Sequence, residues 1–403
     1  MEHIKVVDMH CDTISMIQYK RNRGKSAFLR KNDMRIDLEK LKQGGYMLQT
    51  FAIFTDLEEK DPLETALEQA DIFYQEMEAN QDLIGPVTTM AQAERNMAEG
   101  KLSALLSLEG GDACRGNLSV LRDFYRLGVR MLTLTWNNEN ELAYPQTPRR
   151  RKKRSGIGKA HSVVRDALQR GFSAGSGGLS AGPEGFSADS GSPFAGSGGL
   201  SAGPESTVER QRERGLKEAG FAFLEEMERL GMIIDVSHLS DDGFYDVLEH
   251  TSRPFVASHS NARVLAAHPR NLTDSMLKSL ADRGGVAGVN FYNRFLSVPC
   301  GSRSGLPAAA DFAGQDAYPE TTTNEAIICQ IRHMTDIAGM ESVGLGTDFD
   351  GFECPMEMEN CSMLQKLAED LKRAGFTNGE IEGIFYKNVI RVYREILDRG
   401  TAG

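Results

Sequence analysis

Short apolar runs alternate along this chain with longer segments of helical periodicity. The runs are rich in Val, Ile, Leu and Phe, as expected for strands buried on both faces of a parallel sheet. The eight runs are Ile4–His10, Tyr46–Phe54, Leu102–Glu109, Arg130–Trp136, Met232–His238, Pro254–His259, Gly285–Tyr292 and Ser342–Asp348. Strands that alternate with helices in this way predict repeated β–α units.

The segments between the runs carry helix signals. Asp61–Ala79 has Pro62 at a first helical position, and Gly215–Leu230 repeats apolar residues at helical spacing. After the eighth run, Ser362–Ala374 and Asn378–Leu397 also have a helical pattern. Eight units predict an α/β fold of the (β/α)₈ TIM-barrel type, in which functional side chains lie at the C-terminal ends of the strands.

One region interrupts this rhythm between the fourth and fifth predicted strands. Gln146–Thr207 contains six consecutive basic residues, Arg149–Arg154, and then a tract rich in Gly, Ser, Ala and Pro. Within the tract, Ala174–Glu184 recurs identically at Ala195–Glu205. The tract has too few large apolar residues for their burial to offset the conformational entropy that the segment would lose on ordering. We therefore predict a mobile insertion, and we interpret the basic run as a solvated charge cluster.

Composition narrows the class of protein. The chain has 403 residues, 40% of them hydrophobic and 26% charged, which is enough to bury one large core. We therefore expect a single barrel domain over residues 1–403 with the insertion within it. The net charge of −11 argues against nucleic acid or an anionic membrane as the main partner. No apolar run approaches the roughly 20 residues of a membrane span.

The N-terminus and the cysteines indicate a compartment. The first predicted strand begins at Ile4, which leaves no room for a targeting segment. The six cysteines include no CxxC pair, so free thiols in a reducing compartment are expected. Both observations predict a cytoplasmic protein.

Metal-binding side chains gather at the ends of the predicted strands. The candidate ligands are His10, Asp12, Glu109, His238 and His259. Imidazoles and carboxylates are normal zinc ligands, and a shared carboxylate can hold two ions roughly 3.5–4 Å apart. We predict two zinc ions per chain, with His10 and Asp12 on one and His238 and His259 on the other. Glu109 would be the bridge.

Two further residues near the same rim suggest catalytic and substrate-binding roles. Asp348 ends the eighth run, where a carboxylate can take a proton from metal-bound water and deliver it to a leaving amine. Asp350, before Gly351, is interpreted as a turn residue. Arg270 follows the sixth run and is a candidate for clamping a substrate carboxylate, although a surface arginine that caps a helix fits the residues equally well.

At this point the chain resembles the membrane dipeptidase family, also called renal dipeptidase or peptidase family M19, within the metal-dependent amidohydrolase-like barrels. The resemblance covers nearly the whole chain outside Gln146–Thr207. Its motifs are VVDMHCD at Val6–Asp12, LSLEGGDA at Leu106–Ala113, MLTLTWN at Met131–Asn137, IIDVSHLSD at Ile233–Asp241, VASHSNAR at Val256–Arg263, PRNLTD at Pro269–Asp274, VNFYN at Val289–Asn293 and VGLGTDFDG at Val343–Gly351.

The resemblance implies the same metal ligands and bridge. It also implies Arg270 as the anchor for the substrate's C-terminal carboxylate, Asp348 for proton transfer, and a homodimer. One substrate-contacting position departs from the family pattern: Trp136 stands where mammalian members carry a histidine at the end of strand four. An indole offers only one N–H donor and more bulk, which puts turnover and substrate range in question.

The sequence therefore predicts a zinc-dependent dipeptidase that hydrolyses dipeptides by metal-activated water. Two alternatives stay open. The first is another dinuclear-metal amidohydrolase that acts on cyclic amides, lactones or lactams. The second is a non-catalytic, metal-binding homologue.

Overall fold

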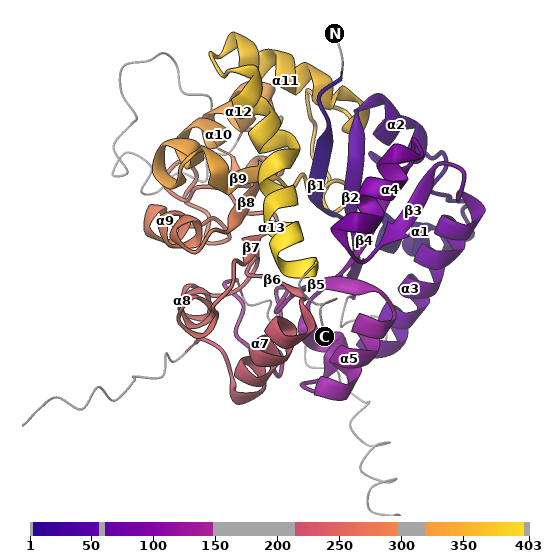
Figure 1. Ribbon diagram of the computed structural model, residues 1–403, viewed down its shortest axis with the longest axis vertical. Helices are drawn as coiled ribbons and strands as arrows, with labels where there is room; N and C mark the ends of the chain where they lie inside the picture. Colours follow the sequence, from indigo (N-terminus) through magenta and orange to yellow (C-terminus); the bar gives the residue numbers. More distant parts are fainter. Residues whose placement is uncertain (1–2, 56–60, 148–213, 297–318, 399–403) are drawn as a thin grey trace, which may run out of the picture. The chain divides into compact units, whose positions relative to one another are not determined.

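The computed structural model describes residues 3–55, 61–147, 214–296 and 319–398 of the chain (Figure 1). Its described strands form one parallel sheet in the order β2-β1-β9-β8-β7-β6-β5-β4-β3, and an additional β2–β4 pairing closes eight of them into a barrel. The strands are β1 (Val6–Cys11), β2 (Tyr46–Phe54), β3 (Ile84–Val87), β4 (Leu102–Glu109), β5 (Val129–Thr133), β6 (Ile233–Asp235), β7 (Val256–Ala257), β8 (Val286–Val289) and β9 (Val343–Leu345). The predicted (β/α)₈ barrel is confirmed.

β3 lies outside the barrel and was not among the predicted strands. It pairs with the first residues of β4, Leu102–Leu105, whereas β5 pairs with the later residues Leu106–Glu109. On its other side β4 pairs with β2 from Ser103 onward. β3 has the sequence Ile-Gly-Pro-Val, and Gly and Pro are tolerated mainly in edge strands. Because two of its four residues are Gly and Pro, it was not recognised as an apolar run.

Each of the eight predicted runs contains an observed strand, but the strands of the second half are shorter than predicted. Met232–His238, for example, contains β6 over Ile233–Asp235 only. The last residues of these runs leave the sheet and form the loops above it. The polar ends of the runs therefore become loop residues at the C-terminal rim.

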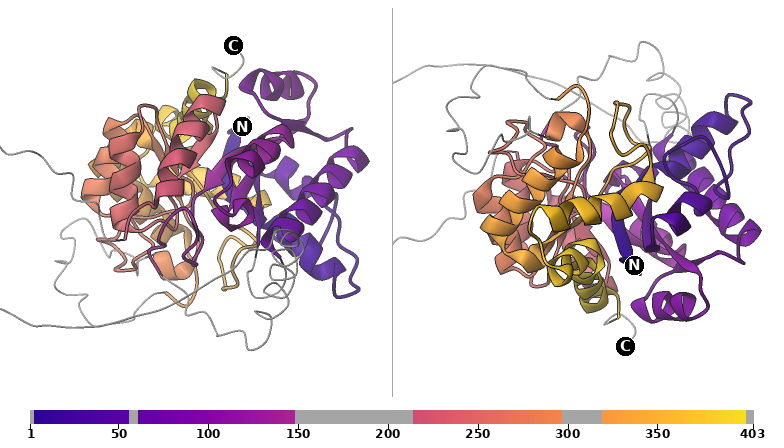
Figure 2. Two further views of the ribbon diagram at one scale, coloured as in Figure 1. Left: turned by 90° about the horizontal axis from the view of Figure 1, so that it is seen from below. Right: turned by 90° about the horizontal axis from the view of Figure 1, so that it is seen from above.

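The helices surround the strands, and Figure 2 shows the first and second halves of the described chain lying side by side. They are α1 (Thr13–Arg21), α2 (Leu38–Gln43), α3 (Pro62–Ala79), α4 (Met90–Ala98), α5 (Leu118–Arg126), α7 (Glu218–Leu230), α8 (Asp241–His250), α9 (Asp274–Asp282), α10 (Asn324–Ala338), α11 (Leu364–Arg373), α12 (Asn378–Glu382) and α13 (Asn388–Leu397). Pro62 begins α3 as predicted, and Asp61 caps the helix by accepting from the backbone N–H of Leu63. The predicted final helix is α12, a π-helical turn and α13 in succession.

The last helix closes the N-terminal end of the barrel. α13 crosses the strands in Figure 1, and its apolar residues pack against side chains from the first halves of the strands. Those strand residues include Val7 and Leu48. Inside this core the Tyr393 hydroxyl lies 3.1 Å from Thr50 Oγ1. The bottom of the barrel is therefore a packed core, and the chemistry belongs at the other end.

The described residues that flank the predicted insertion lie beside each other and beside the loop after β6. Ala143 pairs with Leu216 in an antiparallel bridge, and the Gln146 N–H donates to the His238 carbonyl at 2.8 Å. Apart from Gln146 and Thr147, the segment Gln146–Thr207 lies outside the described residues. Its predicted mobility, and the single-domain organisation of the whole chain, stay predictions.

The described residues bear on two further expectations. None of their helices combines the length and the apolar character needed to cross a bilayer. The cysteines among them, Cys11, Cys114, Cys329, Cys354 and Cys361, are free thiols, and Cys300 lies outside the described residues.

Candidate metal centre

The five predicted ligands converge at the C-terminal rim of the barrel. His10 lies near the end of β1, Asp12 is the residue directly before α1, and Glu109 is the last residue of β4. His238 and His259 follow β6 and β7. All five are buried. The pairing of β1 with β2 is irregular between Asp8 and Cys11, and such irregularities re-aim the side chains beside them.

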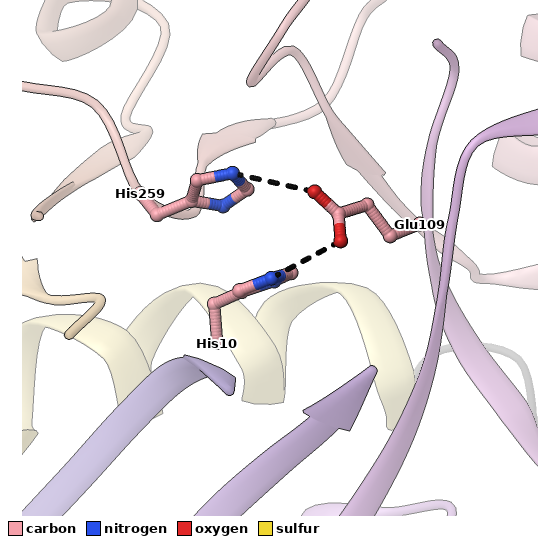
Figure 3. Close-up of side chains that lie close together, drawn as sticks. All are labelled: His10, Glu109 and His259. Carbon is pink, nitrogen blue, oxygen red and sulfur yellow. Dashed lines mark ion pairs between the residues drawn. The ribbon is translucent and has the colours of Figure 1, made fainter. Parts of the chain in front are cut away.

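The Glu109 carboxylate faces the histidines from one side, and Figure 3 shows one of its oxygens directed to His10 and the other to His259. Its Oε2 is 3.4 Å from His10 Nε2, while its Oε1 is 3.1 Å from His238 Nε2 and 3.6 Å from His259 Nε2. Burial acts to raise the pKa of Glu109, but His10 and His238 outweigh it and hold that pKa well below its usual range. The two carboxylate oxygens thus face different imidazoles, which is the geometry a bridging ligand requires.

His10 also approaches two other carboxylates. Its Nε2 is 3.5 Å from Asp12 Oδ2 and 3.9 Å from Asp348 Oδ1. Burial alone would lower the pKa of His10, but the charges of Glu109 and Asp12 raise it well above the usual value. Within the described residues, neither ring nitrogen of His10 has a hydrogen-bond partner, and the same is true of Asp12 Oδ1. Buried polar atoms of this kind are costly unless a ligand satisfies them.

The other two imidazoles face each other across the centre. His238 Nε2 and His259 Nε2 are 2.9 Å apart. On the far side of each ring, His238 Nδ1 lies 3.0 Å from Asn137 Oδ1, and His259 Nδ1 lies 2.7 Å from Ser258 Oγ. Burial and the nearby Arg270 lower the pKa of His238 to about 4, and burial and His10 hold that of His259 well below its usual value. Both rings are therefore neutral, which is the form that binds a metal.

The donor set fits a divalent cation. Ligand atoms of His10, Glu109 and His259 lie within 4.8 Å of one another, and so do those of His10, Asp12 and Asp348. His10 belongs to both groups, so the two predicted ligand pairs are not separated in space. Nitrogen and carboxylate donors in a buried pocket suit zinc and other first-row divalent metals. The buried ring nitrogens of His10 and the Oδ1 of Asp12, which make no hydrogen bond within the described residues, are the observation on which this fit rests.

Asp348 is held in a strained conformation beside the ligands. Its φ is 62° and that of His238 is 68°, values that side-chain-bearing residues rarely adopt and that cluster at functional sites. Its Oδ2 accepts from Asn290 Nδ2 at 2.9 Å, and burial next to Asp12 raises its pKa to about 7. A Cβ atom on Gly351 would lie 2.3 Å from Asp12 Oδ2, so only glycine permits this close approach.

A cavity of ≈ 340 Å³ opens onto this cluster, and Arg270 lines it. Arg270 is only 5% exposed, so the alternative of a surface arginine is wrong. Its Nη1 donates to Ser260 Oγ at 3.4 Å, but its Nε and Nη2 have no hydrogen-bond partner among the described residues. Burial lowers the pKa of Arg270 to about 10, and the side chain stays charged at neutral pH. A buried cation with free donors is suited to bind an anion.

Aromatic side chains form another wall of the cavity. Trp136 and Phe54 pack edge to face with ring centroids 4.7 Å apart, and the indole lies 6.3 Å from the His238 ring. Tyr292, Phe295 and Phe352 also line the cavity. Trp136 thus lines the cavity beside His238 and adds apolar area to it, and its contact with substrate stays a prediction.

Sequence reasoning missed the polar residues that support the ligands. Asn137 and Ser258 contact histidine rings, Asn290 contacts Asp348, and Asp235 contacts Ser258. Three of them lie within three residues of a predicted ligand or of Trp136, so their position was a signal. Ser258 contacts the ring of its sequence neighbour His259, but the other contacts join segments far apart in the chain, and no spacing within a single motif reveals those partners.

Comparison with known proteins places the chain in a family. The family model for membrane dipeptidase (peptidase family M19) matches residues 1–165 and 191–401. The chain belongs to the membrane dipeptidase family. The predicted resemblance is confirmed, and membership makes the chain a peptide-bond hydrolase with a divalent-metal site.

Relatives and solved structures agree with this assignment. An uncharacterized dipeptidase of Schizosaccharomyces pombe is 30% identical over 98% of this chain and 81% of its own length. A metallo peptidase from Rhodobacter sphaeroides, liganded with a phosphinate mimic of the dipeptide L-Ala-D-Ala, superimposes with a TM-score of 0.74 at 21% identity, covering 98% of this chain and 100% of its own. The dipeptidase AC of family M19 gives 0.73 at 21% identity, over 98% and 99%. At such identities the superpositions show the fold alone.

Proposed function

We propose that this dipeptidase-family protein is a dinuclear zinc dipeptidase with His10, Asp12, Glu109, His238 and His259 as its metal ligands. The observation that carries the proposal is the combination of side chains at one small cavity. It combines the convergent donor set around Glu109 with the buried, incompletely paired guanidinium of Arg270. A metal cluster and a carboxylate anchor in the same cavity suit a substrate that has a scissile amide close to a free carboxylate.

Each residue then has a role in hydrolysis. Zinc bound by the ligands would supply Lewis-acid activation of the scissile carbonyl and of water. Asp348, whose pKa near 7 suits both acceptance and release of a proton, receives the proton of the attacking water and passes it to the leaving amine. Arg270 binds the C-terminal carboxylate through its free Nε and Nη2 donors.

The cavity supports a short substrate. Its volume of ≈ 340 Å³ is at the small end of the range for ligand sites, about 300–1,000 Å³. Trp136 and Phe54 cover apolar substrate surface and exclude water from the reacting amide. Because the Rhodobacter sphaeroides metallo peptidase of the same fold is liganded with a mimic of L-Ala-D-Ala, dipeptides with a C-terminal D-residue belong among the candidates.

The test is a panel of dipeptides given to zinc-loaded protein. The panel includes C-terminal L- and D-residues, and each dipeptide is paired with its C-terminal amide. We expect release of free amino acids from the acids and a strong preference for acid over amide, because only the acid engages Arg270. Hydrolysis of cyclic amides, lactones or lactams, together with no preference for the dipeptide acid over its amide, would support another amidohydrolase. Zinc binding without any hydrolysis would support a non-catalytic homologue. The cytoplasmic location and the homodimer stay predictions.

A further inference from the structure

A buried carboxylate outside the ligand set organises the far side of His259. Asp235, the last residue of β6, is 0% exposed and accepts four hydrogen bonds. Its Oδ1 accepts from the backbone N–H groups of Ser237 (3.0 Å) and Ser258 (2.8 Å). Its Oδ2 accepts from the hydroxyls of Thr133 and Ser258, each at 2.6 Å. Backbone N–H groups can only donate, so Oδ1 must be an unprotonated oxygen.

Ser258 connects this carboxylate to the His259 ring. Its Oγ lies 2.6 Å from Asp235 Oδ2 and 2.7 Å from His259 Nδ1. A hydroxyl carries a single proton, and here that proton is donated to the carboxylate. The bond to the imidazole must therefore use the ring's own proton, with His259 Nδ1–H donating to Ser258 Oγ. The lone pair is then on Nε2, the atom that faces Glu109.

We propose that Asp235 and Ser258 are positioning residues that fix the tautomer of His259 and thereby set its affinity for the metal. This inference deepens the proposed function, because it depends on His259 as a ligand but not on which amide is hydrolysed. Partners of this kind, which hold the second nitrogen of a ligating histidine, typically change metal affinity 10–100-fold when they are removed. The hydrogen-bonded chain Asp235–Ser258–His259 is called the tautomer relay below.

Hydrogen bonds to the backbone of His259 help to hold the tautomer relay in place. The His259 N–H donates to Ser237 Oγ at 3.1 Å, and Asn290 Nδ2 donates to the His259 carbonyl at 3.3 Å. A Cβ atom on Gly346, directly after β9, would lie 1.7 Å from the Ser258 carbonyl oxygen. The backbone of Ser258 is therefore closely packed at its carbonyl group.

An isosteric substitution, Asp235→Asn, reverses the hydrogen-bond direction. Oδ1 must remain an oxygen because it accepts from two backbone N–H groups, so the new amide NH₂ takes the place of Oδ2. That NH₂ donates to Ser258 Oγ, and the Ser258 proton is then donated to His259 Nδ1. The ring proton must move to Nε2, where it blocks the metal. The size of the side chain is unchanged, so the effect separates hydrogen-bond direction from packing.

Asp8 supplies a matched control. It is also 0% exposed, and it accepts from the Thr347 N–H, the Thr347 hydroxyl and the His10 backbone N–H. These described bonds involve backbone and hydroxyl groups rather than a ring nitrogen. Asp8→Asn removes the same charge from the barrel interior without the reversal. Ser258→Ala is a second variant, which removes the hydroxyl and leaves the His259 tautomer unrestrained.

Two measurements test the tautomer relay in the full-length protein. ¹⁵N-histidine NMR of the metal-free protein should show His259 as the Nδ1–H tautomer in the wild type and as the Nε2–H tautomer in Asp235→Asn. Competition with a chromophoric zinc chelator should show zinc affinity reduced roughly 10–100-fold in Asp235→Asn, less in Ser258→Ala, and less again in Asp8→Asn. Circular dichroism confirms that each variant is folded.

A wild-type His259 in the Nε2–H form would overturn the proposal. So would equal losses of zinc affinity in Asp235→Asn and Asp8→Asn, because charge alone would then explain the effect. If the NMR and zinc results are as expected but no dipeptide is hydrolysed, the tautomer relay stands and the proposed function fails.

Discussion

His238 and His259 bring their Nε2 atoms to within 2.9 Å of each other while their Nδ1 atoms are occupied by Asn137 and Ser258. On the proposed tautomer of His259, and with the His238 ring proton donated to Asn137 Oδ1, two lone pairs face each other in a buried site. Their repulsion is relieved by a cation that both nitrogens can bind. On this proposal, the metal-free protein has an unfavourable interaction at this point that a bound metal ion removes.

Metal removal should therefore destabilise the protein. We expect chelation to lower the melting temperature and added zinc to restore it, because a ligand at 1,000 times its Kd stabilises the folded state by about 4 kcal/mol. Differential scanning calorimetry with and without chelator measures the shift. Glu109→Gln is the control, since it keeps the shape of the bridge and removes its charge, and it should lose most of the zinc-dependent shift. Equal melting temperatures for the wild type with and without metal would contradict the metal centre.

Loss of the carboxylate anchor should act on substrate binding. Arg270→Ala removes a buried charge partner, a change that typically costs about 2–5 kcal/mol, so kcat/KM for dipeptides should fall at least roughly 30-fold, mainly through KM. Steady-state kinetics on the acid and on its C-terminal amide measure this, and the amide should be little affected. Arg270→Lys keeps the charge without the planar fork and should be intermediate. A fall confined to kcat would argue against the anchor.

Substitution of Asp348 should lower kcat, whereas substitution of Asp350 should mainly lower the melting temperature. Asp348→Asn should lower kcat by roughly 10²–10⁴ with KM and zinc content retained, because an amide cannot shuttle a proton. The oxygens of Asp350 accept from Thr13 Oγ1 at 2.7 Å and from the Arg35 N–H at 2.8 Å, so Asp350→Asn should mainly lower the melting temperature. Kinetics and thermal unfolding of both variants decide between them, and a larger loss of kcat in Asp350→Asn would reverse the assignment.

Trp136 should set substrate size. Trp136→Ala removes the ring that packs on Phe54 and enlarges the cavity beside His238. We expect kcat/KM for dipeptides with small side chains to fall roughly 10-fold or more from the lost apolar contact, and bulkier dipeptides to lose less. Zinc content, measured by atomic absorption, should not change. A uniform loss across all side-chain sizes would show that Trp136 does not shape the substrate pocket.

The barrel should fold without most of the insertion. We expect deletion of Arg149–Glu205 to leave folding and zinc content intact, because Ala143 pairs with Leu216 at its edges. In addition, Arg122 on α5 bonds Glu226 on α7 at 3.0 Å across the gap. Circular dichroism, size-exclusion chromatography and metal analysis test this. Aggregation of the shortened chain would show that the segment is needed for the fold.

The strand pattern allowed the barrel and the convergence of the candidate ligands to be predicted together. Parallel strands place their C-terminal ends on one rim, so Glu109 at the end of β4 and His10 near the end of β1 meet although 99 positions separate them in the chain. The same argument predicted that His238 and His259 lie on this rim. It could not find β3, because the Gly and Pro within that strand resemble a turn.

The hydrogen-bond partners of the ligands were beyond sequence reasoning for a different reason. Whether Ser258 Oγ donates or accepts depends on Asp235 of the neighbouring strand, and the two residues are 23 positions apart. The positive φ of His238 likewise depends on the loop around it, in which the Gln146 N–H donates to the His238 carbonyl. Such features follow from packing between segments rather than from a repeat within one.

The position of α13 also constrains how the molecule can be made in the cell. Its Tyr393 enters the interior beside Thr50, and β1 pairs with β9, the strand nearest the other end of the described chain. Synthesis proceeds from the N-terminus at about 5–20 residues per second, so the first strands wait tens of seconds for the partners that cover them. Until α13 has left the ribosome, the lower core is exposed to water. We therefore expect this protein to be most prone to aggregation, and to depend most on chaperones, while only part of the barrel has been synthesised.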